Sequence, residues 1–143
     1  MECEFPSINS NKGEIKAIFE NTKTIAVIGL SPDESKDSNR VAKYLQNVGF
    51  KIIPVYPKEE MILGEKVFRS LAEIDCVVDL VNIFRKPDFV MNVVEEAIAR
   101  NDVKTIWTQK GIVNNEAAEL AQKHNMNVVQ NYCTMVEHRN IFG

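Results

Sequence analysis

The stretch Thr24–Arg40, TIAVIGLSPDESKDSNR, places a glycine, serines and an arginine directly after an apolar segment. Backbone N–H groups after such a segment, a serine hydroxyl and a guanidinium are groups that bind phosphate oxygens. Glycine lets a ligand approach the backbone closely, and arginine meets phosphate oxygens with two parallel hydrogen bonds. The stretch therefore predicts a site for a phosphorylated ligand at Gly29, Ser31, Ser38 and Arg40. The alternative is an ordinary loop in which Ser38 only caps the next helix and Arg40 faces water.

The same stretch matches the fingerprint of dinucleotide-binding folds only in part. That fingerprint, GxGxxG, needs two further glycines, but Ser31 and Glu34 stand at those positions. The second strand of such folds commonly ends in an acidic residue that binds the adenosine ribose, whereas here the sequence is Val55-Tyr56-Pro57-Lys58. Both differences argue against a nicotinamide dinucleotide. Lys58 suits an additional phosphate, or it pairs with the two glutamates that follow it.

Further segments place aromatic, cationic and amide side chains at expected strand ends. Phe84 beside Arg85 is suited to stack on an adenine or a ribose, and Gln109 with Gly111 offers hydrogen bonds and close backbone approach. The structural alternative is that Phe84 closes the core, Arg85 faces water and Gln109 satisfies a turn. The candidate ligand-binding residues outside the first loop are Pro54, Val55, Tyr56, Lys58, Phe84, Arg85, Gln109 and Gly111.

Cysteines and histidines give no sign of a disulfide framework or a metal site. The three cysteines, Cys3, Cys76 and Cys133, are odd in number and lack CxxC spacing. Reduced thiols are therefore expected, as in proteins of a reducing compartment. Neither His124 nor His138 has a second metal ligand at helical spacing.

These candidate residues must be positioned by alternating strands and helices. Apolar, β-branched runs that end at glycine or proline predict strands, and apolar residues at helical spacing predict helices. The expected strands are Thr24–Leu30, Lys51–Tyr56, Cys76–Phe84, Val103–Gln109 and Asn127–Tyr132. The expected helices are Lys12–Asn21, one capped by Ser38 and ended by Gly49, Pro87–Arg100, and one from Asn114 or Asn115 to His124.

Three remaining segments are expected to have little regular structure. Met61–Phe68 is predicted to be irregular, Ser70–Ile74 to form a single helical turn, and the last residues, CTMVEHRNIFG, to form a tail. The predicted fold is a Rossmann-like α/β domain with a doubly wound, five-stranded parallel sheet in three layers. Residues 1–143 are expected to form this single domain, with the ligand at the carboxyl ends of the strands.

Composition narrows the classes of function. The chain has 143 residues, 45% of them hydrophobic, and 17 Lys and Arg against 20 Asp and Glu give a net charge of −3. A basic stripe is missing, which argues against a nucleic-acid partner. The N-terminus lacks the cationic and apolar segments of a signal peptide, and the apolar runs are too short to span a bilayer. We therefore expect no membrane partner and a cytoplasmic location.

Five blocks of the sequence resemble the small single-domain CoA-binding proteins, which are similar to the CoA-binding domain of the succinyl-CoA synthetase α subunit. The blocks are VIGLSPDESKDSNRVAKYLQNVGFKIIPVYP, ILGEKVFRSLAEI, VDLVNIFRKPDFV, TQKGIVNNEAA and NYCTMVEH. The resemblance implies that coenzyme A binds with its pyrophosphate on Gly29, Leu30 and Ser31, supported by Arg40. The adenosine then faces Pro54–Lys58 and Phe84-Arg85, and Gln109 and Gly111 line the opposite wall.

The resemblance implies a protein that binds CoA or an acyl-CoA as a non-catalytic carrier, sensor or regulatory module. The synthetase uses a phosphorylatable histidine in a further domain, and His138 here has only Glu137 as a candidate acid–base partner. The alternatives are a subunit of an acyl-CoA enzyme completed by a partner chain, and a nicotinamide-dinucleotide sensor. A homodimer is a further expectation.

Cys133 follows the last expected strand, close to the expected position of the CoA thiol. We hypothesise that it forms a mixed disulfide with CoA under oxidation. The alternative is a buried structural cysteine, because free cysteine is among the most buried residue types.

Overall fold

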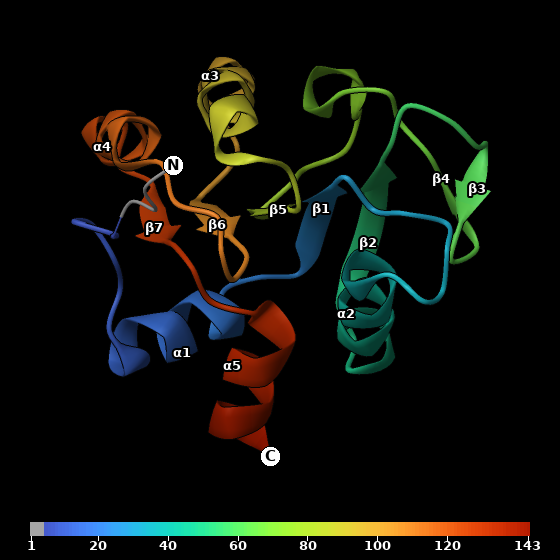
Figure 1. The fold of residues 1–143 in the computed structure, drawn as a ribbon, viewed down its shortest axis with the longest axis horizontal. Coiled ribbons are helices and arrows are strands. Elements are labelled where there is room, and N and C mark those ends of the chain that lie inside the picture. Colours follow the sequence, from blue (N-terminus) through green and yellow to red (C-terminus); the bar gives the residue numbers. More distant parts are fainter. Residues whose placement is uncertain (1–4) are drawn as a thin grey trace.

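The computed structural model describes residues 5–143 and contains a parallel sheet of five strands in the order β2-β1-β5-β6-β7 (Figure 1). From β1 the chain moves to one side for β2 and then returns to the other side of β1 for β5. This reversal confirms the predicted doubly wound, Rossmann-like sheet. The strands of the sheet are β1 Thr24–Ile28, β2 Lys51–Val55, β5 Leu80–Ile83, β6 Thr105–Thr108 and β7 Asn127–Val129.

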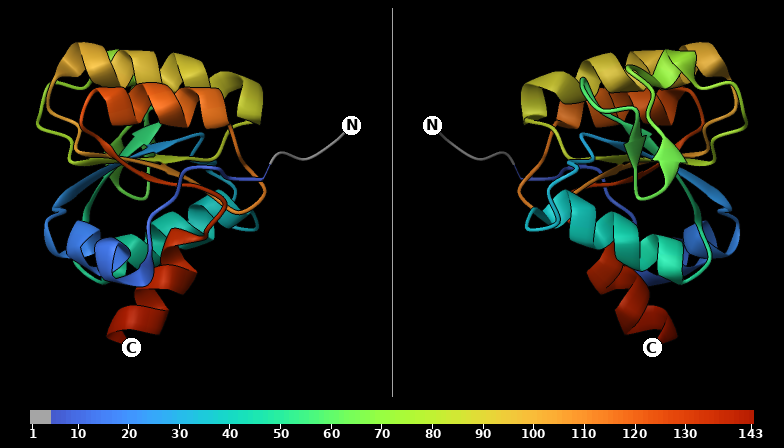
Figure 2. Two further views of the ribbon diagram at one scale, coloured as in Figure 1. Left: turned by 90° about the vertical axis from the view of Figure 1, so that its left-hand side faces the viewer. Right: turned by 90° about the vertical axis from the view of Figure 1, so that its right-hand side faces the viewer.

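Helices cover both faces of the sheet and give three layers (Figure 2). One face carries α1 Lys12–Glu20, α2 Asp37–Asn47 and α5 Thr134–Phe142. The other face carries α3 Val90–Arg100, α4 Asn115–Lys123 and two short 3-10 helices, η1 Leu71–Glu73 and η2 Pro87–Phe89. Within residues 5–143, no helix combines the length and the apolar character that crossing a membrane requires.

Alternation along the strands divides the core into two apolar layers. In β1, Ile25 and Val27 pack toward α1 and α2, whereas Ala26 and Ile28 pack toward α3 and α4. Trp107 of β6 is fully buried on the α1 face, and its indole N–H donates to the Tyr132 carbonyl at 2.8 Å. Because both faces are covered, the strands are largely apolar, with Asn82 of β5 and Thr105 and Thr108 of β6 as buried polar residues.

Side-chain caps fix the start of two helices. Asn11 accepts from the Glu14 N–H and the Glu14 carboxylate accepts from the Asn11 N–H, which is a complete capping box for α1. Asn114, one of the two candidates, caps α4 by accepting from the Ala117 N–H at 3.0 Å.

The expected cap at Ser38 is wrong. Lys36 is the N-cap of α2, and Ser38 lies inside the first turn, where its hydroxyl accepts from the Ser31 N–H at 3.0 Å. The serine therefore ties the preceding loop to the helix instead of capping the helix.

Two segments expected to lack regular structure are ordered. The last residues form helix α5, because Thr134 is buried against the sheet and His138 packs against α1 and α2. Residues 61–68 contain an antiparallel pair, β3 Met61–Ile62 and β4 Glu65–Lys66. The predictions of a tail and of an irregular segment are therefore wrong.

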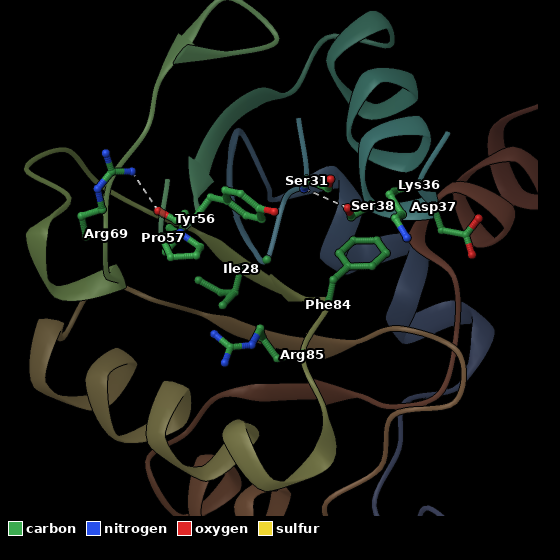
Figure 3. A pocket seen from close by; sticks show the side chains of 12 residues that line it. Ile28, Ser31, Lys36, Asp37, Ser38, Tyr56, Pro57, Arg69, Phe84 and Arg85 are labelled. Carbon is green, nitrogen blue, oxygen red and sulfur yellow. Dashed lines mark hydrogen bonds between the residues drawn. The ribbon is translucent and has the colours of Figure 1, made fainter. Parts of the chain in front are cut away.

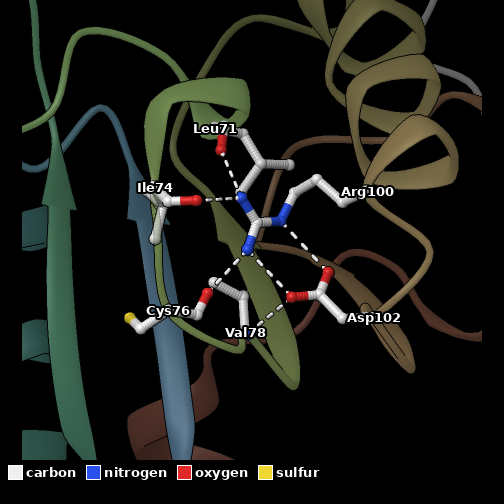
Figure 4. A network of polar contacts seen from close by, with 6 residues as sticks. All are labelled: Leu71, Ile74, Cys76, Val78, Arg100 and Asp102. Carbon is white, nitrogen blue, oxygen red and sulfur yellow. Dashed lines mark hydrogen bonds and ion pairs between the residues drawn. The ribbon is translucent and has the colours of Figure 1, made fainter.

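The strand expected at Cys76–Phe84 begins only at Leu80, because a guanidinium holds the preceding residues in a loop (Figure 4). Arg100 donates to the carbonyls of Leu71 at 3.0 Å, Ile74 at 2.6 Å and Cys76 at 2.7 Å, and it pairs with Asp102 at 2.8 Å.

Asp102 completes this network by accepting from the Val78 N–H at 3.0 Å. Burial alone raises the pKa of Asp102, but the hydrogen bonds from Arg100 and Val78 outweigh burial and lower it. The carboxylate therefore stays charged beside the guanidinium, and the loop is fixed from both sides.

Candidate functional site

Three strand ends meet at Gly29, at the point where the strand order reverses. The Gly29 N–H donates to the Val55 carbonyl at 2.9 Å, and the Phe84 N–H donates to the Ile28 carbonyl at 2.8 Å. Gly29 has a φ of +86°, and a Cβ atom built on it would lie 2.5 Å from the Phe84 carbonyl oxygen. Only glycine fits both this conformation and this close approach.

The loop after Gly29 is tied to the first turn of α2. The Asn39 side-chain amide donates to the Ser31 carbonyl at 2.8 Å, and the Ser31 hydroxyl accepts from the Asp33 N–H at 3.1 Å. Hydrogen bonds from the Ser35 N–H and hydroxyl lower the pKa of Asp33, which keeps this exposed loop carboxylate ionised. The loop is thereby a fixed edge of the site.

The N-terminus of α2 supplies positive charge beside this loop. Within residues 5–143, no side-chain hydrogen bond caps the helix at Lys36. The first-turn N–H groups of such a helix point at an incoming anion, and the helix dipole favours that anion. Arg40 also lies in this turn, but its guanidinium pairs with the Asp37 carboxylate and donates to the Ser35 carbonyl at 3.4 Å.

A cavity of about 650 Å³, the first cavity, opens between this helix end and the ends of β1, β2 and β5 (Figure 3). Its charged residues are the cations Lys36, Arg69 and Arg85 and the carboxylate of Asp37. Positive charge therefore exceeds negative charge around it. The remaining lining residues are Ile28, Gly29, Ser31, Ser38, Val55, Tyr56, Pro57 and Phe84.

The two arginines of the first cavity are held in place by their surroundings. One Arg69 nitrogen, Nη1, donates to the Tyr56 carbonyl at 3.0 Å and to the Lys58 carbonyl at 2.8 Å. The Arg85 guanidinium lies over the Phe89 ring, 4.0 Å from its centre. An arginine that is already ordered loses less side-chain entropy when it binds a phosphate.

A second cavity, of about 590 Å³, adjoins the first, because Asp37, Phe84 and Arg85 line both. It lies between the start of α2, the ends of β5 and β6, and the start of α5. Its other lining residues are Arg40, Val41, Lys86, Pro87, Gln109, Lys110, Gly111, Ile112, Cys133, Met135 and Val136.

A buried polar network stands behind the second cavity. Gln109 is 4% exposed, and its side-chain amide donates to the Asn82 side-chain oxygen and to the Thr134 hydroxyl at 3.0 Å. The Asn82 amide donates to the same hydroxyl at 3.1 Å. This network joins β5, the end of β6 and the first residue of α5. The Gln109 amide nitrogen already donates to two partners within the protein.

The structure divides the residues predicted from the sequence into four groups. Gly29, Ser31, Val55 and Tyr56 line the first cavity; Arg40, Gln109, Gly111 and Cys133 line the second; Phe84 and Arg85 line both. Leu30, Pro54 and Lys58 line neither cavity: Leu30 is fully buried, Pro54 lies in β2, and Lys58 is exposed. The contacts of all these residues with a ligand remain predictions.

Sequence reasoning missed two cations of the first cavity, Lys36 and Arg69. Lys36 could have been found by placing the N-cap of α2 two residues earlier, since Lys36 immediately precedes Asp37, the acidic residue of the first turn. Arg69 gave no local signal, because its position depends on a parallel bridge between Val55 and Phe68. Within residues 5–143, no group of three or more His, Cys, Asp and Glu side chains is placed to hold a metal ion.

Residues 23–139 match the family described as the CoA binding domain. The chain belongs to this family. Membership confirms the resemblance predicted from the five sequence blocks.

Relatives of the chain are both small proteins and parts of larger enzymes. It is 39% identical over 130 residues to the uncharacterized protein YneT of Bacillus subtilis, which covers 91% of this chain and 96% of YneT. It is 32% identical over 121 residues to the ADP-forming acetate–CoA ligase I of Archaeoglobus fulgidus, covering 78% of this chain and 18% of the ligase. A solved structure of a hypothetical protein from Pyrococcus horikoshii superposes with a TM-score of 0.91 at 36% identity, over 100% of both chains.

Proposed function

We propose that this chain binds coenzyme A or an acyl-CoA across the carboxyl ends of β1, β2 and β5, as a non-catalytic carrier, sensor or regulatory module. The observation that carries the proposal is the convergence of the α2 N-terminus, Lys36, Arg69 and Arg85 on one cavity beside Gly29. CoA carries a pyrophosphate and a separate phosphate on its adenosine, so it needs cations at more than one place. Membership of the CoA-binding domain family supports this ligand.

The geometry suggests how the ligand is divided among the residues of the first cavity. The pyrophosphate lies against Gly29, Ser31 and the α2 N-terminus, with Lys36 neutralising part of its charge. The adenosine and its phosphate face Tyr56 and Arg69 at the end of β2. Leu30 contributes its backbone alone, because its side chain is buried in the core.

Arg69, the cation at the end of β2, argues against the nicotinamide-dinucleotide alternative. A site for NAD commonly uses a carboxylate at this position to bind ribose hydroxyls. Here Arg69 lies against the turn at Tyr56 and Lys58 through its two carbonyl contacts. A guanidinium favours a phosphate on the adenosine, so NAD is the weaker candidate.

A second candidate is that the chain is part of an acyl-CoA enzyme whose active site a partner chain completes. The observation that favours it is the match to the acetate–CoA ligase, of which this chain spans 18%. Steady release of free thiol from acetyl-CoA by the purified chain would contradict the non-catalytic role.

The binding proposal is tested by exchanging one of two lysines on the same helix for alanine. Lys36, the N-cap of α2, lines the first cavity, whereas Lys43, which is exposed within α2, lines neither cavity. In calorimetric titration, Lys36→Ala should weaken CoA binding about fivefold to tenfold, or about 1 to 1.4 kcal/mol, because a charge-assisted contact is lost. Lys43→Ala should leave the dissociation constant within about twofold at physiological salt, since screening reduces the effect of distant charges. Equal losses in the two variants would mean that CoA is not bound at this helix end.

A further inference from the structure

We propose that the second cavity receives the sulfur end of CoA with its acyl group, and that helix α5 forms the wall that selects acyl groups by size. The inference rests on the proposed function, because it assumes that the phosphates occupy the first cavity. It adds the class of ligand, acyl thioesters of limited length, and the element that discriminates among them.

The two cavities adjoin along one strip at the ends of the strands. Asp37, Phe84 and Arg85 line both of them, so a single extended molecule can pass from one to the other over Phe84. CoA is such a molecule: its nucleotide end is highly charged and its other end is a thiol on a long uncharged arm. With the phosphates at the α2 N-terminus, the arm has the second cavity directly beside it.

The second cavity also has the chemistry that an uncharged thioester needs. Val41, Ile112, Met135 and Val136 give it apolar surface between the starts of α2 and α5. The cations that also line it are Arg40, Arg85, Lys86 and Lys110. Arg40 is paired with Asp37, and the Arg85 guanidinium lies over the Phe89 ring. Burial of apolar surface contributes about 25 cal/mol per Å², so a short acyl chain gains affinity there only while it fits.

Helix α5 is anchored to the sheet at its first residue. Thr134 is fully buried, and its hydroxyl accepts from the Asn82 amide at 3.1 Å and from the Gln109 amide at 3.0 Å. The next residues, Met135 and Val136, line the second cavity. Moving this wall outward would break both hydrogen bonds to Thr134 and leave the buried Asn82 amide nitrogen without this partner, which is unfavourable.

A second anchor lies one turn further along α5. The His138 ring nitrogen Nδ1 and the Tyr44 hydroxyl of α2 are 2.9 Å apart, and the His138 ring packs edge-on against the Phe19 ring of α1 at 5.2 Å. The start of α5 is therefore held at both anchors, so Met135 and Val136 form a fixed wall of the second cavity. A fixed wall predicts a cut-off in acyl length.

The cut-off is tested by changing the size of the wall residue. Met135→Ala should increase affinity for butyryl-CoA and longer acyl-CoA about tenfold relative to the unmodified chain, by removing volume from the wall. Met61→Ala is the matched control, because Met61 is an exposed methionine of β3 that lines neither cavity. Adenosine 3′,5′-bisphosphate, which lacks the arm, should bind all three proteins equally.

The position of the arm is tested independently by the reactivity of two cysteines. Cys133 lines the second cavity, and Cys76, equally part-buried, lies in the loop before β5 at the opposite end of the strands. Acetyl-CoA, which has no free thiol, should slow alkylation of Cys133 by iodoacetamide at least tenfold and leave Cys76 unchanged. Adenosine 3′,5′-bisphosphate should protect neither cysteine.

These measurements separate the two proposals. If acetyl-CoA binds but leaves Cys133 unprotected and Met135→Ala leaves the acyl preference unchanged, the arm lies elsewhere and this inference alone is overturned. Protection of Cys133 by the bisphosphate would also overturn it, since that ligand has no arm. If neither CoA nor acetyl-CoA binds, the proposed function fails as well.

Discussion

Replacing Gly29 with alanine tests the geometry at the centre of the site. Gly29 has a φ of +86°, and a Cβ there would meet the Phe84 carbonyl oxygen at 2.5 Å and the Arg85 Cδ at 3.2 Å. Gly111 is a matched control for the conformation alone, because its φ is +89° and nothing lies within 4 Å of its Cβ position. The two variants share the backbone strain and differ in the steric contact.

The backbone strain and the steric contact each lower the free energy of unfolding by a different amount. An alanine with positive φ costs about 1 kcal/mol, so Gly111→Ala should lower the free energy of unfolding by about that amount. At Gly29 the contact is with backbone, which cannot rotate away, and relieving such overpacking costs about 1 to 3 kcal/mol more. Gly29→Ala should therefore lose about 2 to 4 kcal/mol in total.

Urea unfolding followed by circular dichroism measures both variants at one temperature. For a chain of this size, about 1 kcal/mol lowers the melting temperature by about 3 to 4 °C, so calorimetry provides a second measurement. Equal losses of stability in Gly29→Ala and Gly111→Ala would refute the close approach of the β1 and β5 ends. A Gly29→Ala protein as stable as the unmodified chain would refute both the strain and the contact.

Three further predictions concern other parts of the chain. Arg100→Lys should lower the free energy of unfolding, measured in urea, by about 2 to 3 kcal/mol, because an ammonium cannot reach all the carbonyls that the guanidinium binds. The control Lys123→Ala removes an exposed ion pair at 3.9 Å and should change the free energy of unfolding by less than about 0.5 kcal/mol. Burial lowers the pKa of His138 below its ordinary value of 6.5, so the unfolded chain binds the proton more readily and the free energy of unfolding should fall as the pH falls below 6.5. His138→Gln should flatten this decline between about pH 6.5 and 5, which lies above the range in which carboxylates titrate. An unchanged decline in the variant would contradict this role of His138. Treatment with diamide and CoA should give a reducible CoA adduct on Cys133 in mass spectrometry, and its absence there would reject the mixed-disulfide hypothesis.

The sequence predicted those parts of the fold that local pattern determines. The β-branched run of β1 ended by Gly29, the apolar spacing of α2, α3 and α4, and the Asn114 cap of α4 each identify an element within a few residues. The doubly wound sheet followed from their alternation. The strand ends that form the first cavity could be predicted for the same reason, since parallel strands bring their carboxyl ends to one edge.

Features that depend on contacts distant in the sequence could not be predicted. Helix α5 has a weak apolar periodicity, and its position follows from contacts with Phe19, Tyr44 and Asn82. Arg69 reaches the first cavity through a bridge between segments that do not adjoin. The second cavity therefore could not be predicted from local pattern, because α5 forms part of its wall through Met135 and Val136.

Calorimetric titration of the unmodified chain with CoA, acetyl-CoA, NAD and NADP tests the central claim most directly. The cations around the first cavity, which include Arg69 at the end of β2, predict saturable binding of CoA and acetyl-CoA at one site per chain. NAD, which has no phosphate on its adenosine ribose, should bind far more weakly than CoA. Binding of NAD without measurable binding of CoA would contradict the account.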